Sequence, residues 1–490
     1  MSAHVELRPG AYADSVTLLQ VSRTVAQLPG VAAAQVAMAT PLNVEVLEGM
    51  GFEIPPEAGV NDLVVAVRLD DTANDSPAEA VLADVLADVL AGVDRALADS
   101  TRRPSGSAEL AAHRTTATAL RDVHDGGVVV LVSVPGPSAV VEAMDAVEAG
   151  RDVMIFSDNV PVEHELALKR AAEPGGVLVM GPDCGTAIVD GVGLGFANVV
   201  SPGPVGIVAA SGTGCQQLLA LLDHAGVGVT SALGVGGRDL GADVGGLATR
   251  EALRRLDAEE SVELVVLVSK PPAPEVATSV QEYAAGLATP VELALLGAGQ
   301  PDLTAAAERV LERLGRPVPT WPVAEPATAR GPVGGTMLRG LFVGGTLAGE
   351  ARQLAAEALG AVGAALDDLH GDGHGVVDFG DDAYTSGRAH PMIDPTLRLD
   401  HLARVADDPR TGVVLLDVVL GHGAEPDPAA LLAPALEAVT APVVVSLVGT
   451  AGDPQGLERQ RAALAAAGAE VHLSNARATR RALELLGATR

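Results

Sequence analysis

Short apolar runs alternate with longer stretches of helical spacing along most of the chain. From Gly127 the runs are VVVLVSV (128–134), DVMIF (152–156), VLVM (177–180), VGIVAA (205–210), VELVVLV (262–268) and VELALL (291–296). Such alternation predicts parallel strands in doubly wound layers covered by helices. The fold class is therefore α/β over this part of the chain.

A second series of apolar runs follows a proline-dense segment, Gly315–Gly335. The runs are GLFV (340–343), GVVLLDVV (412–419), PVVVSLV (442–448) and EVHL (470–473). They predict another α/β unit that reaches the C-terminus. Proline density favours an extended linker before it, which we place at 317–335.

The first 100 residues have a different pattern and predict a small α+β domain of the ferredoxin-like kind. A helix is expected over DSVTLLQVSRTVAQLPG, with Asp14 or Ser15 as its cap, between strands that include VAAAQVAMA and DLVVAVRL. A second helix, over SPAEAVLADVLADVLAGVDRALA, would start with a capping box of Ser76 and Glu79. The polar segment Asp99–Glu109 reads as a linker.

Composition narrows the classes of function. Apolar residues make up 48% of the 490 residues and aromatic residues only 2%, so the cores must be aliphatic, as in buried parallel sheets. The net charge of −31 argues against nucleic acid or an anionic membrane as a general partner. An anionic ligand would need local backbone N–H groups or a few placed cations.

Several classes of site are not expected. The two cysteines, Cys184 and Cys215, make no disulfide framework, and no Cys/His cluster has the spacing of a zinc site, so we expect no metal. The N-terminus has no apolar leader core, and no uninterrupted apolar run is long enough to span a membrane. We therefore expect a soluble cytoplasmic protein.

The clearest candidate for chemistry lies where the VGIVAA run ends. Ser211, Gly212 and Thr213 form a small polar turn at the start of a predicted helix. Unpaired N–H groups and the helix dipole make such a turn an anion site, although a plain capped turn is the alternative. The same design recurs at Gly344, Gly345 and Thr346. If the two helices faced each other, they would hold one anion from both sides.

Other candidates are single residues at strand ends. Lys270 is one of only two lysines and follows a strand, so it is either a cation for an anionic substrate or a solvated loop residue. The polar loop Asp378–Pro395 carries Arg388 and His390, for substrate binding or proton transfer. Gly421 and His422 lie at a third Gly-rich strand end, where a plain turn is the favoured interpretation of the histidine. Cys184, in the turn after Gly181 and Pro182, is a nucleophile or a small packing residue.

The ordered set of motifs resembles the succinyl-CoA synthetase superfamily, and within it the FdrA family. VSVPGPSAVVEAMDAVEAG, MGPDCGTAI, VGIVAASGTG and LGVGGRDL resemble, in order, the synthetase α subunit. DFGDD…GRAHPMIDP, LLDVVLGHGAEPDPA and VAMAT resemble FdrA proteins. The resemblance implies a CoA-binding-type Rossmann domain (110–200) and two flavodoxin-like ligase domains (204–316 and 336–490) behind the N-terminal domain (1–100).

The resemblance also implies site residues. It places candidate CoA-binding residues at Pro135, Gly136, Gly181, Pro182 and Cys184. It matches the two phosphate-binding helices of the synthetases to helices starting near Ser211 and near Gly421–His422, rather than to the Gly344 turn.

Departures from the synthetase pattern are equally informative. The loop that carries the phosphorylated histidine corresponds to LLGAGQPDL (295–303), which has no histidine. Lys270 stands near the position of that histidine's partner glutamate, and no part of the chain is left for an ATP-grasp domain.

Three functions remain open from the sequence. The first is an FdrA-type subunit that transfers an acyl or carbamoyl group through a carbonyl phosphate, as between oxamate and carbamoyl phosphate in allantoin breakdown, with partner subunits. The second is an acyl-CoA ligase working with a separate ATP-grasp subunit, with CoA as its cofactor. The third is a non-catalytic ligand-binding scaffold. For each, we expect an oligomer with other protein subunits and a small anionic substrate.

Overall fold

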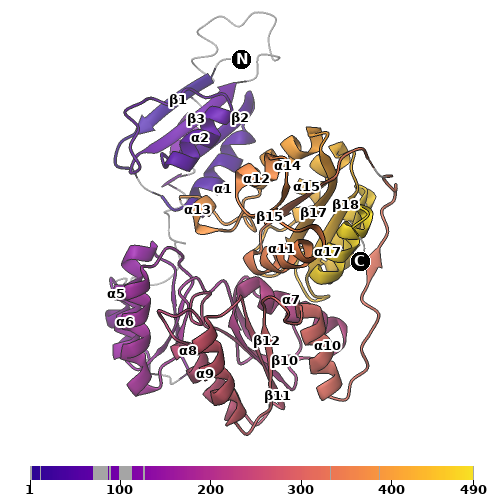
Figure 1. Ribbon diagram of the computed structural model, residues 1–490. Coiled ribbons are helices and arrows are strands. Elements are labelled where there is room, and N and C mark those ends of the chain that lie inside the picture. The colour runs from indigo at the N-terminus through magenta and orange to yellow at the C-terminus, as the bar shows by residue number, and fades with distance from the viewer. Residues whose placement is uncertain are drawn as a thin grey trace, which may run out of the picture. The chain divides into compact units, whose positions relative to one another are not determined.

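The computed structural model describes residues 3–11, 13–69, 86–87, 90–95, 97–98, 113–124, 127–331, 333–385 and 387–488. The chain divides into two compact units, one made of 1–111 with 381–397 and the other of 112–380 with 398–490. Figure 1 shows the elements of both. The expected capping box at Ser76 and Glu79 and the expected linker Asp99–Glu109 lie outside the described residues.

The first unit contains a small antiparallel sheet in the order β1-β3-β2. Its elements are β1 (Ala3–Arg8), α1 (Ser15–Ala26), β2 (Val31–Met38), α2 (Pro41–Gly49), β3 (Leu63–Leu69) and the short α13 (Asp382–Thr385). Asp14 caps α1 as predicted, because its carboxylate accepts the Thr17 N–H at 2.9 Å. Strand β3 is the central strand, and apolar side chains pack on both of its faces.

The second unit begins with a three-stranded parallel sheet in the order β4-β5-β6. Its elements are α4 (Thr116–Leu120), β4 (Val129–Val132), α5 (Gly136–Glu148), β5 (Asp152–Ile155), α6 (Val162–Ala172), the 3₁₀ turn η2 (Glu173–Gly175) and β6 (Val179–Met180). Alanines of α5 and α6 are buried against the valines and isoleucine of the strands, which allows close helix–sheet packing.

A six-stranded sheet follows in the order β12-β11-β9-β10-β7-β8. Its strands are β7 (Thr186–Val189), β8 (Val192–Gly195), β9 (Val205–Ala210), β10 (Val229–Gly234), β11 (Leu264–Ser269) and β12 (Val291–Leu295), and its helices are α7 (Gly212–His224), α8 (Leu247–Asp257), α9 (Pro274–Ala285) and α10 (Leu303–Arg313). The strands β12, β11, β9 and β10 run parallel, and the hairpin β7–β8 adds an antiparallel edge.

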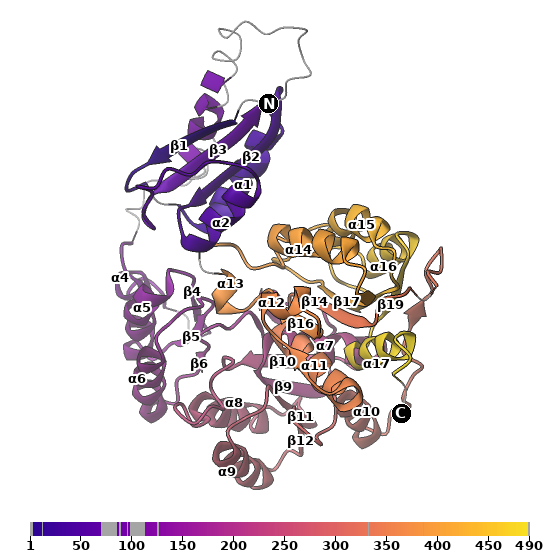
Figure 2. The same ribbon diagram turned by 45° about the horizontal axis from the view of Figure 1, so that its top comes forward.

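The third sheet has seven strands in the order β13-β19-β18-β17-β14-β16-β15. Its strands are β13 (Val323–Ala324), β14 (Met337–Phe342), β15 (Val362–Gly363), β16 (His374–Asp378), β17 (Thr411–Val419), β18 (Val443–Val448) and β19 (Ala469–His472), with helices α11 (Gly345–Leu359), α12 (Leu366–His370), α14 (Thr396–Asp407), α15 (Pro428–Ala438), α16 (Leu457–Ala466) and α17 (Asn475–Leu485). The predicted α/β class with parallel sheets and a small N-terminal α+β unit is confirmed. Helix α7 of the six-stranded sheet packs against α11 of this sheet, as Figure 2 also shows.

Candidate functional site

Two helix N-termini from different sheets face each other in the second unit. Helix α7 starts after β9 with Ser211 as its N-cap, and α11 starts after β14 with Gly344 as its N-cap. The Ser211 Oγ lies 2.6 Å from the Thr346 Oγ1, and both residues are buried. A Cβ atom added to Gly344 would lie 2.9 Å from the Thr213 side chain. The residues Ser211, Gly212, Thr213, Gly344, Gly345 and Thr346 thus form one feature, which we call the cup.

The cup offers backbone N–H groups that the helices do not use. The first helical hydrogen bonds are donated by Cys215 to the Ser211 carbonyl and by Ala348 to the Gly344 carbonyl. The N–H groups of Gly212, Thr213 and Gly345 precede these bonds, so they have no acceptor within their own helix. Two helix dipoles also converge here with their positive ends, which favours an anion.

Lys270 supplies a cation at the rim of the cup. It follows β11, its side chain is exposed, and its Nζ lies 3.2 Å from the position that a Gly345 Cβ would take. In the described part of the chain, no hydrogen bond or ion pair involves this ammonium group. The other lysine, Lys169, is buried and bonds to Glu165 at 2.7 Å and Asp239 at 2.8 Å. Of the two lysines, only Lys270 is available to a ligand.

Two aspartates that were not predicted as site residues also lie at the cup. Asp378 ends β16, and its Oδ2 would be 2.4 Å from a Cβ on Gly345, so only glycine fits there without displacing the carboxylate. Asp417 lies in β17 and accepts the N–H groups of Val343 at 2.8 Å and Gly344 at 2.9 Å. A carboxylate inside an apolar strand is the sequence signal that identifies Asp417.

Asp417 is held at the back of the cup by a buried arginine. The Arg398 Nη1 donates to the Asp417 backbone carbonyl at 2.8 Å and lies 3.3 Å from its Oδ1. Burial raises the pKa of Asp417 to about 7, against the opposing effects of Arg398 and the two backbone N–H groups. This side chain therefore titrates close to neutral pH.

No described helix begins at Gly421–His422, where the resemblance placed the start of a second phosphate-binding helix. These residues lie in the loop after β17, and α15 begins only at Pro428, because Asp427 provides the N-cap and Pro428 suits the first helical position. A Cβ on Gly421 would lie 2.8 Å from the Ala197 carbonyl oxygen, so this glycine packs against backbone. The helix that faces Ser211 is α11, which starts at the Gly344 turn.

Arg388 and His390 belong to the other compact unit, with the N-terminal residues. The Arg388 guanidinium lies 3.6 Å from the Asp394 carboxylate, and both side chains are buried. The His390 Nδ1 accepts the Met392 N–H at 3.2 Å, and burial lowers the pKa of His390 to about 4, so its ring is neutral near pH 7. Asn43 of α2 contacts this segment through a hydrogen bond to the Gly387 carbonyl at 3.1 Å.

The candidate CoA-binding positions are mostly packed. Pro135 is exposed, but a Cβ on Gly136 would lie 2.2 Å from the Asp158 carbonyl oxygen, and one on Gly181 would lie 2.5 Å from the Ile155 carbonyl oxygen. Pro182 is buried as well. The glycines therefore bring backbone against backbone.

Cys184 is also buried in this region. Its thiol lies 3.4 Å from the Gly234 carbonyl oxygen, and burial raises its pKa to about 12. A thiol with so high a pKa is protonated near neutral pH, which favours the packing interpretation over the nucleophile.

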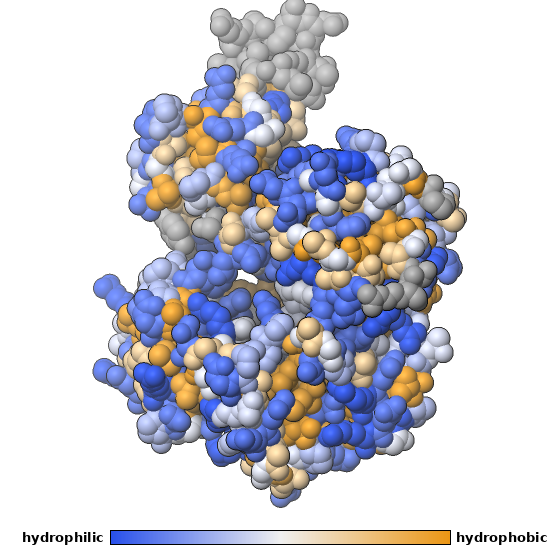
Figure 3. All heavy atoms as spheres, in the orientation of Figure 1, coloured by the Kyte–Doolittle hydropathy of each residue, from blue (hydrophilic) through white to orange (hydrophobic). Residues whose placement is uncertain are grey.

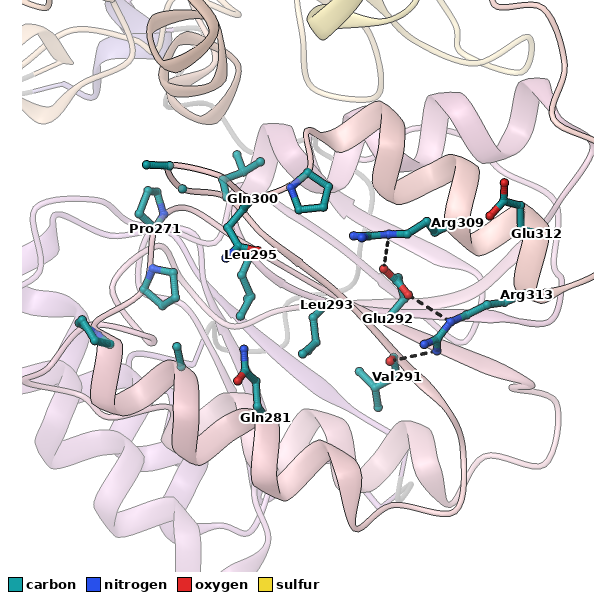
Figure 4. A pocket seen from close by; sticks show the side chains of 17 residues that line it. Pro271, Gln281, Val291, Glu292, Leu293, Leu295, Gln300, Arg309, Glu312 and Arg313 are labelled. Atoms are coloured by element: carbon teal, nitrogen blue, oxygen red, sulfur yellow. Dashed lines mark hydrogen bonds and ion pairs between the residues drawn. The ribbon is translucent and has the colours of Figure 1, made fainter. Parts of the chain in front are cut away.

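A pocket of about 780 Å³ lies between α9, β12 and α10, next to the loop that lacks the histidine (Figure 4). Glu292 is nearly buried there and is paired with Arg309 at 2.7 Å and Arg313 at 3.2 Å. The positive charges of this pocket are therefore already compensated by the protein itself. It offers less to an anion than the cup does.

Among the described residues, no helix combines the length and apolarity needed to cross a bilayer. The same residues contain no group of three or more His, Cys, Asp or Glu side chains arranged to hold a metal ion.

Two family models match the chain. A CoA-ligase domain matches residues 341–485, and the AllF heavy metal-associated domain matches residues 1–113. The description of the second model names a heavy metal. Residues 1–113 contain no cysteine, whereas soft metals are bound mainly by thiolates. The residues present do not fit a soft heavy metal.

Relatives with curated sequences agree with these matches. The protein YahF of Escherichia coli (strain K12) is 37% identical over 457 residues, which covers 87% of this chain and 86% of YahF. The succinate–CoA ligase [ADP-forming] subunit alpha 2 of Archaeoglobus fulgidus is 32% identical over 145 residues, which covers 29% of this chain and 49% of that subunit. Among solved structures, an acetyl-coenzyme A synthetase of Ca. Korarchaeum cryptofilum aligns over 79% of this chain and 87% of its own, at 15% identity and a TM-score of 0.31.

Proposed function

The chain belongs to the FdrA-type family of succinyl-CoA-synthetase-like proteins, and we propose that it transfers an acyl or carbamoyl group to or from a carbonyl phosphate. The reaction we favour converts oxamate and carbamoyl phosphate into oxalurate and phosphate, and the reverse. The observation that carries the proposal is the pairing of two helix N-termini beside the exposed ammonium group of Lys270.

The cup suits the phosphate of such a substrate. The N–H groups of Gly212, Thr213 and Gly345 would bind its oxygens, together with the one hydroxyl proton that the Ser211–Thr346 hydrogen bond leaves free. Lys270 would stabilise the charge that develops when the bond between the carbonyl carbon and the phosphate oxygen breaks. Neither role needs a phosphorylated histidine, which the 295–303 loop lacks.

The acceptor must also lose a proton during the transfer. Its nitrogen attacks the carbonyl carbon, the phosphate leaves with the bonding electron pair, and the nitrogen releases one proton. The Asp378 carboxylate lies over Gly345, next to Lys270, where it would accept that proton. Arg388 and His390 lie in the other compact unit, and their roles in substrate binding and proton transfer stay predictions from the sequence.

The direct test combines the purified chain and the products of its neighbouring genes with oxamate and carbamoyl phosphate. Phosphate and oxalurate are then measured together. Equal formation of both, lost on Lys270→Ala, is the expected result. No turnover with every partner present would contradict the proposal, and retained ligand binding without turnover would favour a non-catalytic scaffold.

Partner subunits are part of the proposal. Strand β4 is an edge strand of its sheet, and Leu131 on it is 53% exposed; on the following helix Val141 is 63% exposed. Figure 3 shows apolar residues (orange) among polar ones where Figure 1 draws α5. An exposed apolar face of this kind fits contact with another subunit. Exchange protection of β4 and α5 on addition of the neighbouring gene products would test this.

The second candidate function is an acyl-CoA ligase that works with a separate ATP-grasp subunit. It is favoured by the match of residues 341–485 to the CoA-ligase model and by the likeness to succinate–CoA ligase α subunits. Calorimetry with CoA and an assay for acid-labile protein phosphate distinguish the ligase from the transferase. Only the ligase requires both CoA binding and a phosphorylated protein.

A further inference from the structure

A second pocket opens on the other side of Lys270. It has a volume of about 270 Å³ and lies between the loops that follow β10 and β11. Its polar lining includes Arg238, Asp243, Ser269 and Lys270. Lys270 therefore borders both this pocket and the cup, so a molecule bound here would lie next to a phosphate bound there.

Arg238 is fixed in place although nearly half of its side chain is exposed. Its Nε donates to the Glu165 Oε2 at 3.1 Å and its Nη2 donates to the Val160 carbonyl at 2.7 Å, while 46% of the side chain remains accessible. Glu165 is itself fully buried and paired with Lys169. The buried Lys169 thereby holds the carboxylate that orients Arg238, and the open part of the guanidinium can bind a ligand at little entropic cost.

The charge and size of the pocket define what it can take. Arg238, Lys270 and Asp243 line it; Arg238 is paired with Glu165, whereas Lys270 brings an exposed ammonium group to the pocket. Ligand sites for larger molecules usually start at about 300 Å³, so the pocket is too small to enclose CoA. A Cβ on Gly237 would meet no atom within 4 Å, so the backbone there faces open space.

We propose that this pocket binds the acceptor of the transfer, a carboxylic acid of few carbons such as oxamate, with its carboxylate on Arg238 and its reactive nitrogen toward Lys270. This assignment of the acceptor site rests on the proposed function. The Nε and Nη2 groups of Arg238 donate to the protein, so its Nη1 group would donate to the carboxylate of the acceptor. The position beside the cup brings acceptor and carbonyl phosphate together.

The test uses calorimetry on the full chain with two probes, oxamate and inorganic phosphate. Arg238→Gln should weaken oxamate binding by about 10- to 100-fold, the usual effect of removing a hydrogen bond to a charged group, and should leave phosphate binding unchanged. Thr346→Val, in the cup, should weaken phosphate binding and leave oxamate binding unchanged. Oxamate affinity that is unchanged in Arg238→Gln, or absent in the wild-type chain, overturns the proposal.

A second pair of variants controls for misfolding. Gly237→Leu places a side chain in the open space of the pocket and should abolish oxamate binding, whereas Gly334→Leu, at another glycine with no atom near its Cβ position, should not. Oxamate affinity that survives Gly237→Leu counts against the pocket. The proposed function can fail while the pocket assignment holds. In that case Arg238→Gln would still weaken only oxamate binding and Thr346→Val only phosphate binding, but the wild-type chain and its partners would show no turnover.

Discussion

The Ser211 and Thr346 hydroxyl oxygens lie 2.6 Å apart, although 135 residues separate them in the chain. Each residue belongs to the first turn or the cap of a different helix, and each helix covers a different sheet. The Ser211 Oγ also accepts the Gly214 N–H at 3.0 Å, so one hydroxyl both caps α7 and contacts α11. This contact fixes the separation of the two helix N-termini that form the cup.

Removal of this hydroxyl pair should therefore affect stability and phosphate binding together. Ser211→Ala, Thr346→Val and the double variant form a double-mutant cycle. We expect a coupling free energy of about 0.5–1.5 kcal/mol in urea unfolding, the usual net value of a hydrogen bond. Phosphate affinity, measured by calorimetry, should fall in both single variants. Strictly additive effects on unfolding would show that the two hydroxyls do not interact.

The two lysines provide a matched pair of substitutions. Lys270→Ala should change the free energy of unfolding by less than about 0.5 kcal/mol, because the side chain is exposed, but should abolish or strongly weaken phosphate binding. Lys169→Ala leaves Asp239 buried without its cation and Glu165 with Arg238 alone, and should cost about 3–5 kcal/mol. Thermal melts and phosphate calorimetry on both variants check this. Phosphate binding that is unchanged in Lys270→Ala would show that Lys270 is not part of the phosphate site.

Glycines of α11 offer another internal comparison. A methyl group on Gly345 would lie 2.4 Å from the Asp378 Oδ2 and 3.2 Å from the Lys270 Nζ, so Gly345→Ala must displace both groups and should weaken phosphate binding. Gly349→Ala, on the same helix, meets no atom within 4 Å and should stabilise the chain by up to about 1 kcal/mol, because alanine favours the helix. Equal phosphate affinity in the two variants would contradict the assigned position of the cup.

The halves of the cup were predictable from the sequence because each is local. The run VGIVAA (205–210) coincides with β9, and a strand followed by Gly, Ser and Thr indicates a helix start. Their pairing is tertiary, and no local pattern encodes it. The helix start near Gly421 was implied by the family resemblance alone; the local signal, Asp427 followed by Pro428, places the start of α15 further along the chain.

Two strands, β10 and β13, were not predicted from the pattern of apolar residues, and each has a physical reason. Strand β10 (Val229–Gly234) is nearly all buried, but its threonine and serine break the apolar run on which the prediction depended. Strand β13 lies inside the segment expected as a linker, where Val323 and Ala324 pair with β19. Edge strands need few apolar residues, so periodicity does not reveal them.

Asp417 should make stability depend on pH in a predictable direction. Folding raises its pKa from the ordinary value of 3.8 to about 7 because the carboxylate is buried, so the folded chain keeps a proton that the unfolded chain releases. Its contribution to stability is complete below about pH 4 and is lost as the pH rises toward 7. Asp417→Asn mimics the protonated side chain and should lack this loss. Relative to the wild-type chain, the variant should therefore gain stability as the pH rises from about 4 to 8 in urea unfolding. A pH-independent difference between the two would mean that Asp417 stays ionised in the folded chain, as a carboxylate dominated by Arg398 and the N–H groups of Val343 and Gly344 would.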